Sequence, residues 1–500
     1  MALSNGKVIL QRKLNAFDVT NLVIGSIIGA DVYVATGLSA QLVGPSSLLI
    51  WILAGVMAMV IAISFAYCVM LKPKVGGPYA YAKEVSTPFA GFMVGWALLL
   101  AEWFSLAVFP VAFAAYFVSL VPGIDAFGIV LLKAFFIAFV IVTNVISVKA
   151  AGRTNDVLTI VKMLPLALII GGGIGFFFYN PGVLSANMTP FVTGDASAFG
   201  TALILVFWAY AGFELATLPA NDVENPEHTI PKAIVFGMLV VIAFYLLTNF
   251  VVVGSVGQAG LMNTSTPLLT ATSTIFSGPT ISVIMVAVVG IGALFSILGA
   301  DESGTIGTSR LAYAMALDGL LPRSFAKLHK DHGTPYVALI AICVSAFFVS
   351  VFGTLTALID SSVFLLAFVY LATCLSAIRL EKKNPEAAKG LHLKVLIPGL
   401  GAGFSFMLLV LVDPVEIVIS LILLAAGILV YAYFSPKKEL AEAKEAFLSE
   451  ESMLRRVARE RTAFLAHPIF HLKRWIYKQR KIPPAIIVTS PEDPNKEQLI

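Results

Sequence analysis

Residues 23–37, VIGSIIGADVYVATG, place three glycines and one acid, Asp31, inside an otherwise apolar run. The run begins near Ala16 and ends near Pro45, which is long enough for a helix to cross the ~30 Å of hydrocarbon in a bilayer. Clustered glycines interrupt a helix, and lipid cannot hydrogen-bond the backbone groups that an interruption leaves without partners. The stretch therefore predicts a broken membrane helix whose open backbone lines a cavity.

The rest of the chain fits a membrane protein. Of its 500 residues, 58% are hydrophobic and only 12% are charged, and the mean hydropathy is +0.91. Apolar runs recur without the period-two alternation of a membrane β-barrel, so the fold class is all-α. About twelve spanning helices are predicted, at residues 17–43, 46–71, 87–119, 127–148, 155–178, 199–219, 232–254, 279–313, 336–353, 357–379, 393–412 and 414–434.

Lys and Arg lie only in alternate gaps between these runs. One set of gaps holds them, at 7–13, 72–83, 149–153, 232, 323–330 and 379–383, and the gaps at 41–47, 120–126, 179–198, 255–278, 354–361 and 412–416 hold none. Basic loops remain in the cytoplasm, so both termini of this multi-pass protein of the cell membrane are predicted to be cytoplasmic.

A second interruption is predicted in VFWAYAGFELATLP, residues 206–219, where Gly212, Glu214 and Pro219 disturb another apolar run. The two breaks open two successive sets of five helices. Broken helices at corresponding places in two halves are typical of inverted-repeat transporters, where they present half-helix ends to a substrate at mid-membrane. Glycines that merely allow close helix packing are the alternative.

Four parts of the chain are expected. They are a cytoplasmic N-terminus (1–16), a transport core in two halves (17–178 and 199–379), two additional helices (393–434) and a basic cytoplasmic tail (435–500). The tail predicts an amphipathic helix on the membrane surface or a solvated helix, with a disordered Pro-rich end. Cys68, Cys343 and Cys374 lie in apolar segments without metal-ligand spacing and are expected to be buried thiols.

Four segments resemble, in order, the markers of the amino acid-polyamine-organocation superfamily of permeases: GSIIGADVYVATG (25–37), GGPYAYAKEVSTPFAGFMVGW (76–96), FWAYAGFELATLPANDVENPEHTIPKAI (207–234) and SRLAYAMALDGLLPRSFAKLHKDHGTPYVAL (309–339). The resemblance covers residues 12–434. It implies a five-plus-five inverted repeat with broken helices 1 and 6, alternating access, and uptake or exchange of amino acids or related amines.

The resemblance also implies substrate contacts at the two breaks, which contain Gly25, Gly29 and Gly212. The backbone carbonyls of Ile27, Trp208 and Ala211 would meet the ammonium group of the substrate. The N–H groups of Ala30 and Asp31 would meet its carboxylate, and the Trp208 ring resembles an aromatic gate. A packing role is the alternative for Trp208.

Asp31 stands where the family commonly has glycine. Two like charges about 4 Å apart repel by about 4 kcal/mol at an effective dielectric constant of about 20, so a carboxylate there opposes a zwitterionic substrate. Three roles remain open for Asp31: a cap of the second half-helix, a counter-ion that replaces the carboxylate of an amine substrate, or an acid that is protonated or paired with a buried cation.

Lys162, in LTIVKMLPLAL, matches a lysine that replaces the sodium ion in proton-coupled relatives. A buried ammonium can release and rebind a proton, so Lys162 is the predicted coupling group. Snorkelling to the cytoplasmic interface is the alternative, because Arg153 lies about two and a half turns away. Lys133, near the outer end of its helix, is expected to snorkel.

Further acids lie in the apolar runs. Glu102, Glu214, Asp301 and Glu302 are predicted to gate or line an acidic pathway. Adjacent helical residues point about 100° apart, so only one of Asp301 and Glu302 is expected to face it. An acidic pathway favours a cationic amino acid or a polyamine.

Other functional classes find less support in the sequence. It has no phosphate-cradling loop for ATP and no metal-ligand pattern among its histidines, so we expect no enzyme, cofactor or metal, and no nucleic-acid partner. The expected partners are a small amino acid or amine, protons and lipid. The prediction is a proton-coupled secondary transporter of amino acids, with an amine or cationic amino acid transporter or exchanger built around Asp31, and a non-transporting nutrient sensor, as alternatives.

Overall fold

The computed structural model describes residues 3–4, 7–8, 14–74, 76–146, 151–218, 220, 223–330, 332–391 and 393–435. The predicted cytoplasmic tail therefore lies outside the described residues. Within the described residues the chain is helical apart from two antiparallel two-residue strands, β1 (Leu3–Ser4) and β2 (Lys7–Val8).

The helices follow the predicted apolar runs closely. They are α1 (Ala16–Ile27), α2 (Ala30–Val43), η1 (Gly44–Ser46), α3 (Ser47–Leu71), α4 (Pro78–Val85), α5 (Pro88–Leu120), α6 (Ala126–Ile146), α7 (Ala151–Tyr179), α8 (Pro181–Asn187), α9 (Ala196–Ala209), η2 (Phe213–Thr217), α10 (Pro226–Leu261), α11 (Pro267–Ile275), α12 (Pro279–Leu317), η4 (Arg323–Ala326), α13 (Tyr336–Phe352), α14 (Leu355–Lys383), η5 (Ala387–Gly390), α15 (Leu396–Leu411) and α16 (Pro414–Phe434).

The described chain contains 9 segments that are long and apolar enough to cross a membrane, the first of which, residues 30–71, holds both α2 and α3. Three apolar helices, α1, α13 and α15, are shorter. With α1 and α2 counted as one interrupted span, these helices correspond to the twelve predicted runs. The predicted all-α, multi-span fold class is confirmed.

Local sequence signals mark the residues at which the helices begin. At α1, Asn15 Oδ1 accepts hydrogen bonds from the N–H groups of Phe17 and Asp18, and Asp18 Oδ2 accepts one from the N–H of Asn15. This capping box satisfies N–H groups that have no partner inside the helix. Proline occupies the first turn of α4, α5, α8, α10, α11, α12 and α16, where its missing N–H costs nothing.

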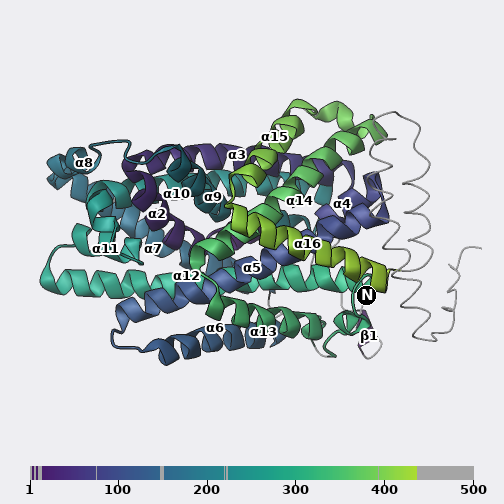
Figure 1. Cartoon of the computed structure of the whole chain (residues 1–500), viewed down its shortest axis with the longest axis horizontal. Coiled ribbons are helices and arrows are strands. Elements are labelled where there is room, and N and C mark those ends of the chain that lie inside the picture. Colours follow the sequence, from purple (N-terminus) through teal and green to yellow (C-terminus); the bar gives the residue numbers. More distant parts are fainter. Residues whose placement is uncertain are drawn as a thin grey trace, which may run out of the picture.

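Figure 1 shows the long helices running side by side between two ends of the molecule. α8 and α11 lie at one end, and α4, β1 and the last residues of α16 lie at the other. α5 packs against α4, α6, α12, α13 and α14, which puts it in the interior. On α6, by contrast, Phe127, Leu131 and Phe135 form an exposed apolar stripe at helical spacing, as a lipid-facing surface requires.

Close helix packing depends on glycine. α7 and α10 approach so closely that a Cβ atom built on Gly173 would lie 2.1 Å from Val251 Cγ1. Gly171, half a turn earlier in the same helix, has no atom within 4 Å of the equivalent position. Small residues let membrane helices approach in this way, so the two glycines make a matched pair.

We expect Gly173→Ala to lower the free energy of unfolding by about 1–3 kcal/mol, because the added methyl overpacks the α7–α10 contact. Gly171→Ala should leave it unchanged or raise it slightly, because alanine favours the helix. Thermal melting of the purified proteins in detergent measures both effects. Equal melting temperatures for the two variants would contradict the packing of α7 on α10.

Candidate substrate-binding site

The first span is interrupted between Ile27, the last residue of α1, and Ala30, the first of α2. Gly29 adopts φ −152° and ψ −135°, outside the helical region. Its missing side chain is needed, because a Cβ atom there would lie 2.4 Å from the Cβ of Ala300 in α12. The break thus lets α12 approach the backbone of the first span.

The second interruption follows α9, which ends at Ala209. Gly212 has φ +118°, a left-handed conformation that side chains disfavour, and a Cβ atom there would lie 2.7 Å from the carbonyl oxygen of Ser26. The chain then forms the short 3₁₀-helix η2, not the α-helical second half that we expected through residue 219. Glu214 lies in the first turn of η2. Pro219 lies outside the described residues.

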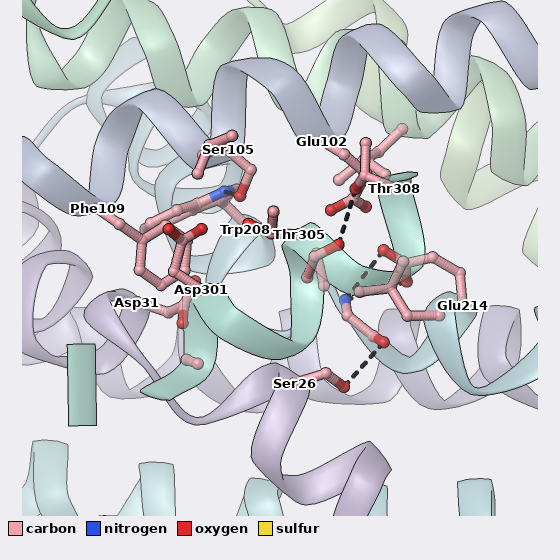
Figure 2. A pocket seen from close by; sticks show the side chains of 17 residues that line it. Ser26, Asp31, Glu102, Ser105, Phe109, Trp208, Glu214, Asp301, Thr305 and Thr308 are labelled. Carbon is pink, nitrogen blue, oxygen red and sulfur yellow. Dashed lines mark hydrogen bonds between the residues drawn. The ribbon is translucent and has the colours of Figure 1, made fainter. Parts of the chain in front are cut away.

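The two interruptions touch. Ser26 Oγ donates a hydrogen bond to the carbonyl oxygen of Gly212 at 3.0 Å, across 186 residues of sequence (Figure 2). The Gly212 carbonyl also accepts the N–H of Leu215 at 3.2 Å, and the Ser26 hydroxyl lies 3.0 Å from the Val23 carbonyl as well. A side chain from the first broken span thus adds a second contact to a backbone group at the second break. The arrangement satisfies, inside the protein, groups that lipid could not.

A cavity of about 30 Å³ lies beside this contact. Its lining includes four acids that were predicted to contact the substrate or to line its pathway, namely Asp31, Glu102, Glu214 and Asp301. Trp208, Ala211 and Gly212 also line it. None of its described lining residues is Lys, Arg or His. A space of this size holds a few water molecules, so a solute the size of an amino acid requires surrounding side chains to move.

Glu214 is tightly held at the second break. Its two carboxylate oxygens accept the N–H of Gly212 at 3.1 and 3.0 Å, and Tyr370 donates its hydroxyl to Oε2 at 2.9 Å. Glu102 of α5 lines the same cavity, and its side chain lies near that of Glu214 (Figure 2). Glu214 therefore stabilises the turn around Gly212 as well as lining the cavity.

Asp31 lies in the first turn of α2, and its side chain is buried. The N–H groups of Gly29 and Asp31 interact with its carboxylate, and Lys162 is the positive charge that acts on it. Its Oδ2 atom is buried and has no hydrogen-bond partner among the described residues. These contacts combine features of the capping and paired roles, while one oxygen remains available to the cavity.

Lys162 of α7 lies behind the first break, outside the cavity lining. It is 1% exposed, and its Nζ donates to the carbonyl oxygen of Gly25 at 3.0 Å. The space for this side chain comes from Gly299 of α12, where a Cβ atom would lie 2.7 Å from Lys162 Cε. The alternative of snorkelling to the interface is therefore wrong for Lys162.

Lys133 does not snorkel either. Its side chain is 9% exposed, and Nζ donates to the carbonyl oxygen of Ser350 in α13. This hydrogen bond keeps the ammonium group inside the helix bundle, against our expectation.

Trp208 covers one wall of the cavity. The indole Nε1 donates to Ser105 Oγ at 3.3 Å, and the ring meets Phe109 edge-on, with the ring centroids 6.2 Å apart. Figure 2 shows both rings beside the carboxyl groups of Asp31 and Asp301. The indole is thus positioned by α5 on one side and by the second break on the other.

Other predicted contacts are absent from the cavity lining. Ile27, Ala30, Gly25 and Gly29 do not line it, and the carbonyl oxygen of Ile27 already accepts the Tyr245 hydroxyl at 3.0 Å. Asp301 does line it, whereas the Glu302 side chain lies outside the described part of the chain.

Several residues that form the site were not predicted from the sequence. They are Ser26, Ser105, Phe109, Thr305 and Thr308 in the lining, and Tyr245 and Tyr370 behind it. Ser26 lies within the first quoted stretch and could have been found there. Single hydroxyls and aromatic rings in apolar helices give no comparable signal.

A larger cavity of about 490 Å³ lies toward the α8–α11 end. It is formed by α2, α5, the turn before α11 and the start of α14, and its described lining has no charged residue. At the opposite end, Lys83 of α4 pairs with Asp318 after α12 at 2.8 Å, and Tyr79 donates to the same carboxylate.

The described residues that line this cavity include no cysteine. Cys68, Cys343 and Cys374 are buried and free, as expected. Within the described ranges, no three His, Cys, Asp or Glu residues are grouped so that they could hold a metal ion.

We expect Gly212→Ala to lower the free energy of unfolding by about 1–3 kcal/mol, because alanine at φ +118° is strained and its methyl meets the Ser26 carbonyl. It should also impair ligand binding, since the break shapes the cavity. Gly171→Ala adds the same methyl group where no atom lies within 4 Å and serves as the control. A Gly212→Ala protein that melts with the wild type would contradict the contact between the breaks.

Known proteins match this chain over most of its length. Residues 14–447 match the family described as "Amino acid permease". The chain is 28% identical to the branched-chain amino acid permease BcaP of Bacillus subtilis (strain 168), over 87% of this chain and 96% of that protein. It is 28% identical to the methylthioribose transporter of the same organism, over 86% and 95%, and 30% identical to the cystine/glutamate transporter of Homo sapiens, over 86% of each.

The names of these relatives describe transporters or permeases, not enzymes. Their substrates differ widely, so the comparisons support transport more strongly than any one substrate. The family match and the multi-span fold confirm the resemblance noted in the sequence. The chain is a multi-pass membrane protein and belongs to the amino acid permease family.

Proposed function

We propose that this permease is a secondary active transporter that moves amino acids across the cell membrane by alternating access and is driven by protons. The observation that carries the proposal is the hydrogen bond from Ser26 Oγ to the Gly212 carbonyl, which joins two interrupted spans beside a closed polar cavity. Half-helix ends at mid-membrane can bind the charged groups of a small solute, because the backbone dipoles there are unopposed.

The difference between the two ends supports alternating access, because one holds a large cavity and the other an ion pair between distant segments. The cavity of about 490 Å³ lies on the side whose loops lack Lys and Arg, which we assign to the outside. The Lys83–Asp318 pair closes the other side by joining α4 of the first half to the end of α12 in the second. Opening that side requires this pair to separate. The same assignment of sides places both termini in the cytoplasm.

A zwitterionic substrate would use the open backbone of the breaks. By resemblance, its ammonium group meets the carbonyls of Ile27, Trp208 and Ala211, and its carboxylate meets the N–H groups of Ala30 and Asp31. Entry requires Trp208 to move and the Tyr245 hydroxyl to share the Ile27 carbonyl, which has a second lone pair.

Proton coupling rests on Lys162. Its ammonium group holds the Gly25 carbonyl at the end of the first half-helix and acts on Asp31 at the start of the second. Loss of its proton removes the positive charge from both contacts at once. A change of protonation at this position therefore alters the shape of the break that binds substrate.

An amine transporter is the second candidate, and the free Oδ2 atom of Asp31 favours it. A buried carboxylate oxygen without a described partner can take the place of a substrate carboxylate and hold an ammonium group directly. In such an amine transporter, Asp31 itself supplies the negative charge at the N-terminus of α2, so the substrate needs no carboxylate.

Selective counterflow in liposomes tests the proposed function. We expect a preloaded amino acid to accelerate uptake of the same labelled amino acid, because one cavity carries both in turn. A protein that binds an amino acid without exchanging it would be a sensor, and exchange of diamines alone would favour the amine transporter. Ionic current far above transporter rates would contradict both versions.

We expect Lys162→Met to abolish the acceleration of uptake by an inward proton gradient, because methionine keeps the length of the side chain but carries no proton. Lys133→Met is the matched control, since it removes the other described lysine buried in a span but lies away from the breaks. Uptake is measured with and without the imposed gradient. Normal gradient dependence in Lys162→Met would overturn the assignment of the coupling group.

A further inference from the structure

The acids that line the cavity gather at two places. Figure 2 shows Asp31 and Asp301 beside Phe109, whereas Glu102 and Glu214 lie together near Thr308. The first pair comes from α2 and α12, and the second from α5 and η2. A cavity with carboxyl groups at two separate positions differs from one with a single acidic wall, because it can hold two cations that are apart.

Glu102 and Glu214 form one acidic cluster in the cavity lining (Figure 2). Glu214 accepts the Gly212 N–H and the Tyr370 hydroxyl, and such donors stabilise a carboxylate. An ammonium group beside the two carboxyl groups favours their ionised forms, because opposite charges attract.

This pair is accessible from the cavity. Glu102 is only partly buried, and Gly304 of α12 leaves open space beside it, with Glu102 Oε2 the nearest atom at 4.0 Å from a built Cβ position. Described basic side chains do not line the cavity, so no protein cation occupies this space. A small cationic group can therefore reach the pair.

Two unpartnered polar atoms in the same lining point to a ligand. Asp31 Oδ2 and Thr305 Oγ1 both belong to side chains at most 5% exposed, and neither has a hydrogen-bond partner among the described residues. Buried polar groups are normally satisfied by protein, water or ligand. Thr305 lies on α12, the helix that also carries Asp301 and Gly304.

We propose that the substrate carries two ammonium groups separated by an aliphatic chain, and that the Glu102–Glu214 pair binds the second of them. This rests on the proposed function, because the first ammonium group is the one held at the helix breaks. A basic amino acid of the lysine type and a simple diamine share this chemistry. The charge-assisted hydrogen bonds between an ammonium group and a carboxylate give the selectivity.

Binding of lysine, norleucine and cadaverine distinguishes a basic amino acid, a neutral amino acid and a diamine as the preferred ligand. Norleucine is lysine without its side-chain amine, and cadaverine is lysine without its carboxylate. In thermal-shift titrations of the purified wild-type permease, we expect lysine to bind roughly 10- to 100-fold more tightly than norleucine. Tighter binding of cadaverine than of norleucine, with lysine weak, would support the same pair with a diamine as the source. Norleucine binding as tightly as both would overturn the proposal.

Substitutions at Glu102 and Glu214 then test whether these residues cause the preference for lysine. We expect the double variant Glu102→Gln with Glu214→Gln to lose the preference for lysine, because the two amides keep the size and shape of the side chains without a charge. Glu102→Gln alone should lose less, because Glu214 retains its charge. If the double variant melts normally but keeps the full preference, the pair does not bind the second ammonium group.

The outcome also separates this inference from the proposed function. Counterflow of neutral amino acids without any advantage for lysine overturns only the two-ammonium substrate. If neither an amino acid nor cadaverine exchanges or binds, both fail, whereas cadaverine exchange alone overturns amino acid transport and retains the Glu102–Glu214 site.

Discussion

The architecture depends on the contact between two interrupted membrane spans. Each interruption exposes backbone groups that would be costly in lipid, and the Ser26–Gly212 hydrogen bond shows how the protein satisfies one break with the other. Neither span could do this alone, since the two residues lie 186 positions apart in the sequence. The requirement for satisfied backbone therefore brings the two halves together at the place where a solute can bind.

Ionisable side chains in the membrane spans also find their partners inside the protein. The lysines and acids described here are held by backbone groups or by one another: Lys162 by the Gly25 carbonyl, Lys133 by the Ser350 carbonyl, and Glu214 by the Gly212 N–H. Ionisable groups are expensive at this depth, so each one that the fold retains has a defined partner or a defined task. The free oxygen of Asp31 stands out against this pattern and directs attention to the cavity.

Apolar run length was sufficient to predict the spans, because a bilayer imposes nearly the same length on every helix. The breaks at Gly29 and Gly212 were also predictable, since glycines beside an acid conflict with an uninterrupted membrane helix. The exact partners were not. That Tyr245 would reach the Ile27 carbonyl, or Tyr370 the Glu214 carboxylate, depends on how distant helices cross, and one tyrosine in an apolar run carries no such information. Lys133 was misjudged for the same reason, because Ser350 lies 217 residues away.

The position of the Lys162 ammonium group depends on a side chain that is missing from another helix. At Gly299 even a methyl group would intrude on Lys162 Cε, so any larger residue there displaces the amine from the Gly25 carbonyl. A methyl group at 299 would therefore push the flexible end of the Lys162 side chain into another conformation, although residue 162 itself is unchanged. The proposed coupling group can thus be altered from a helix that does not carry it.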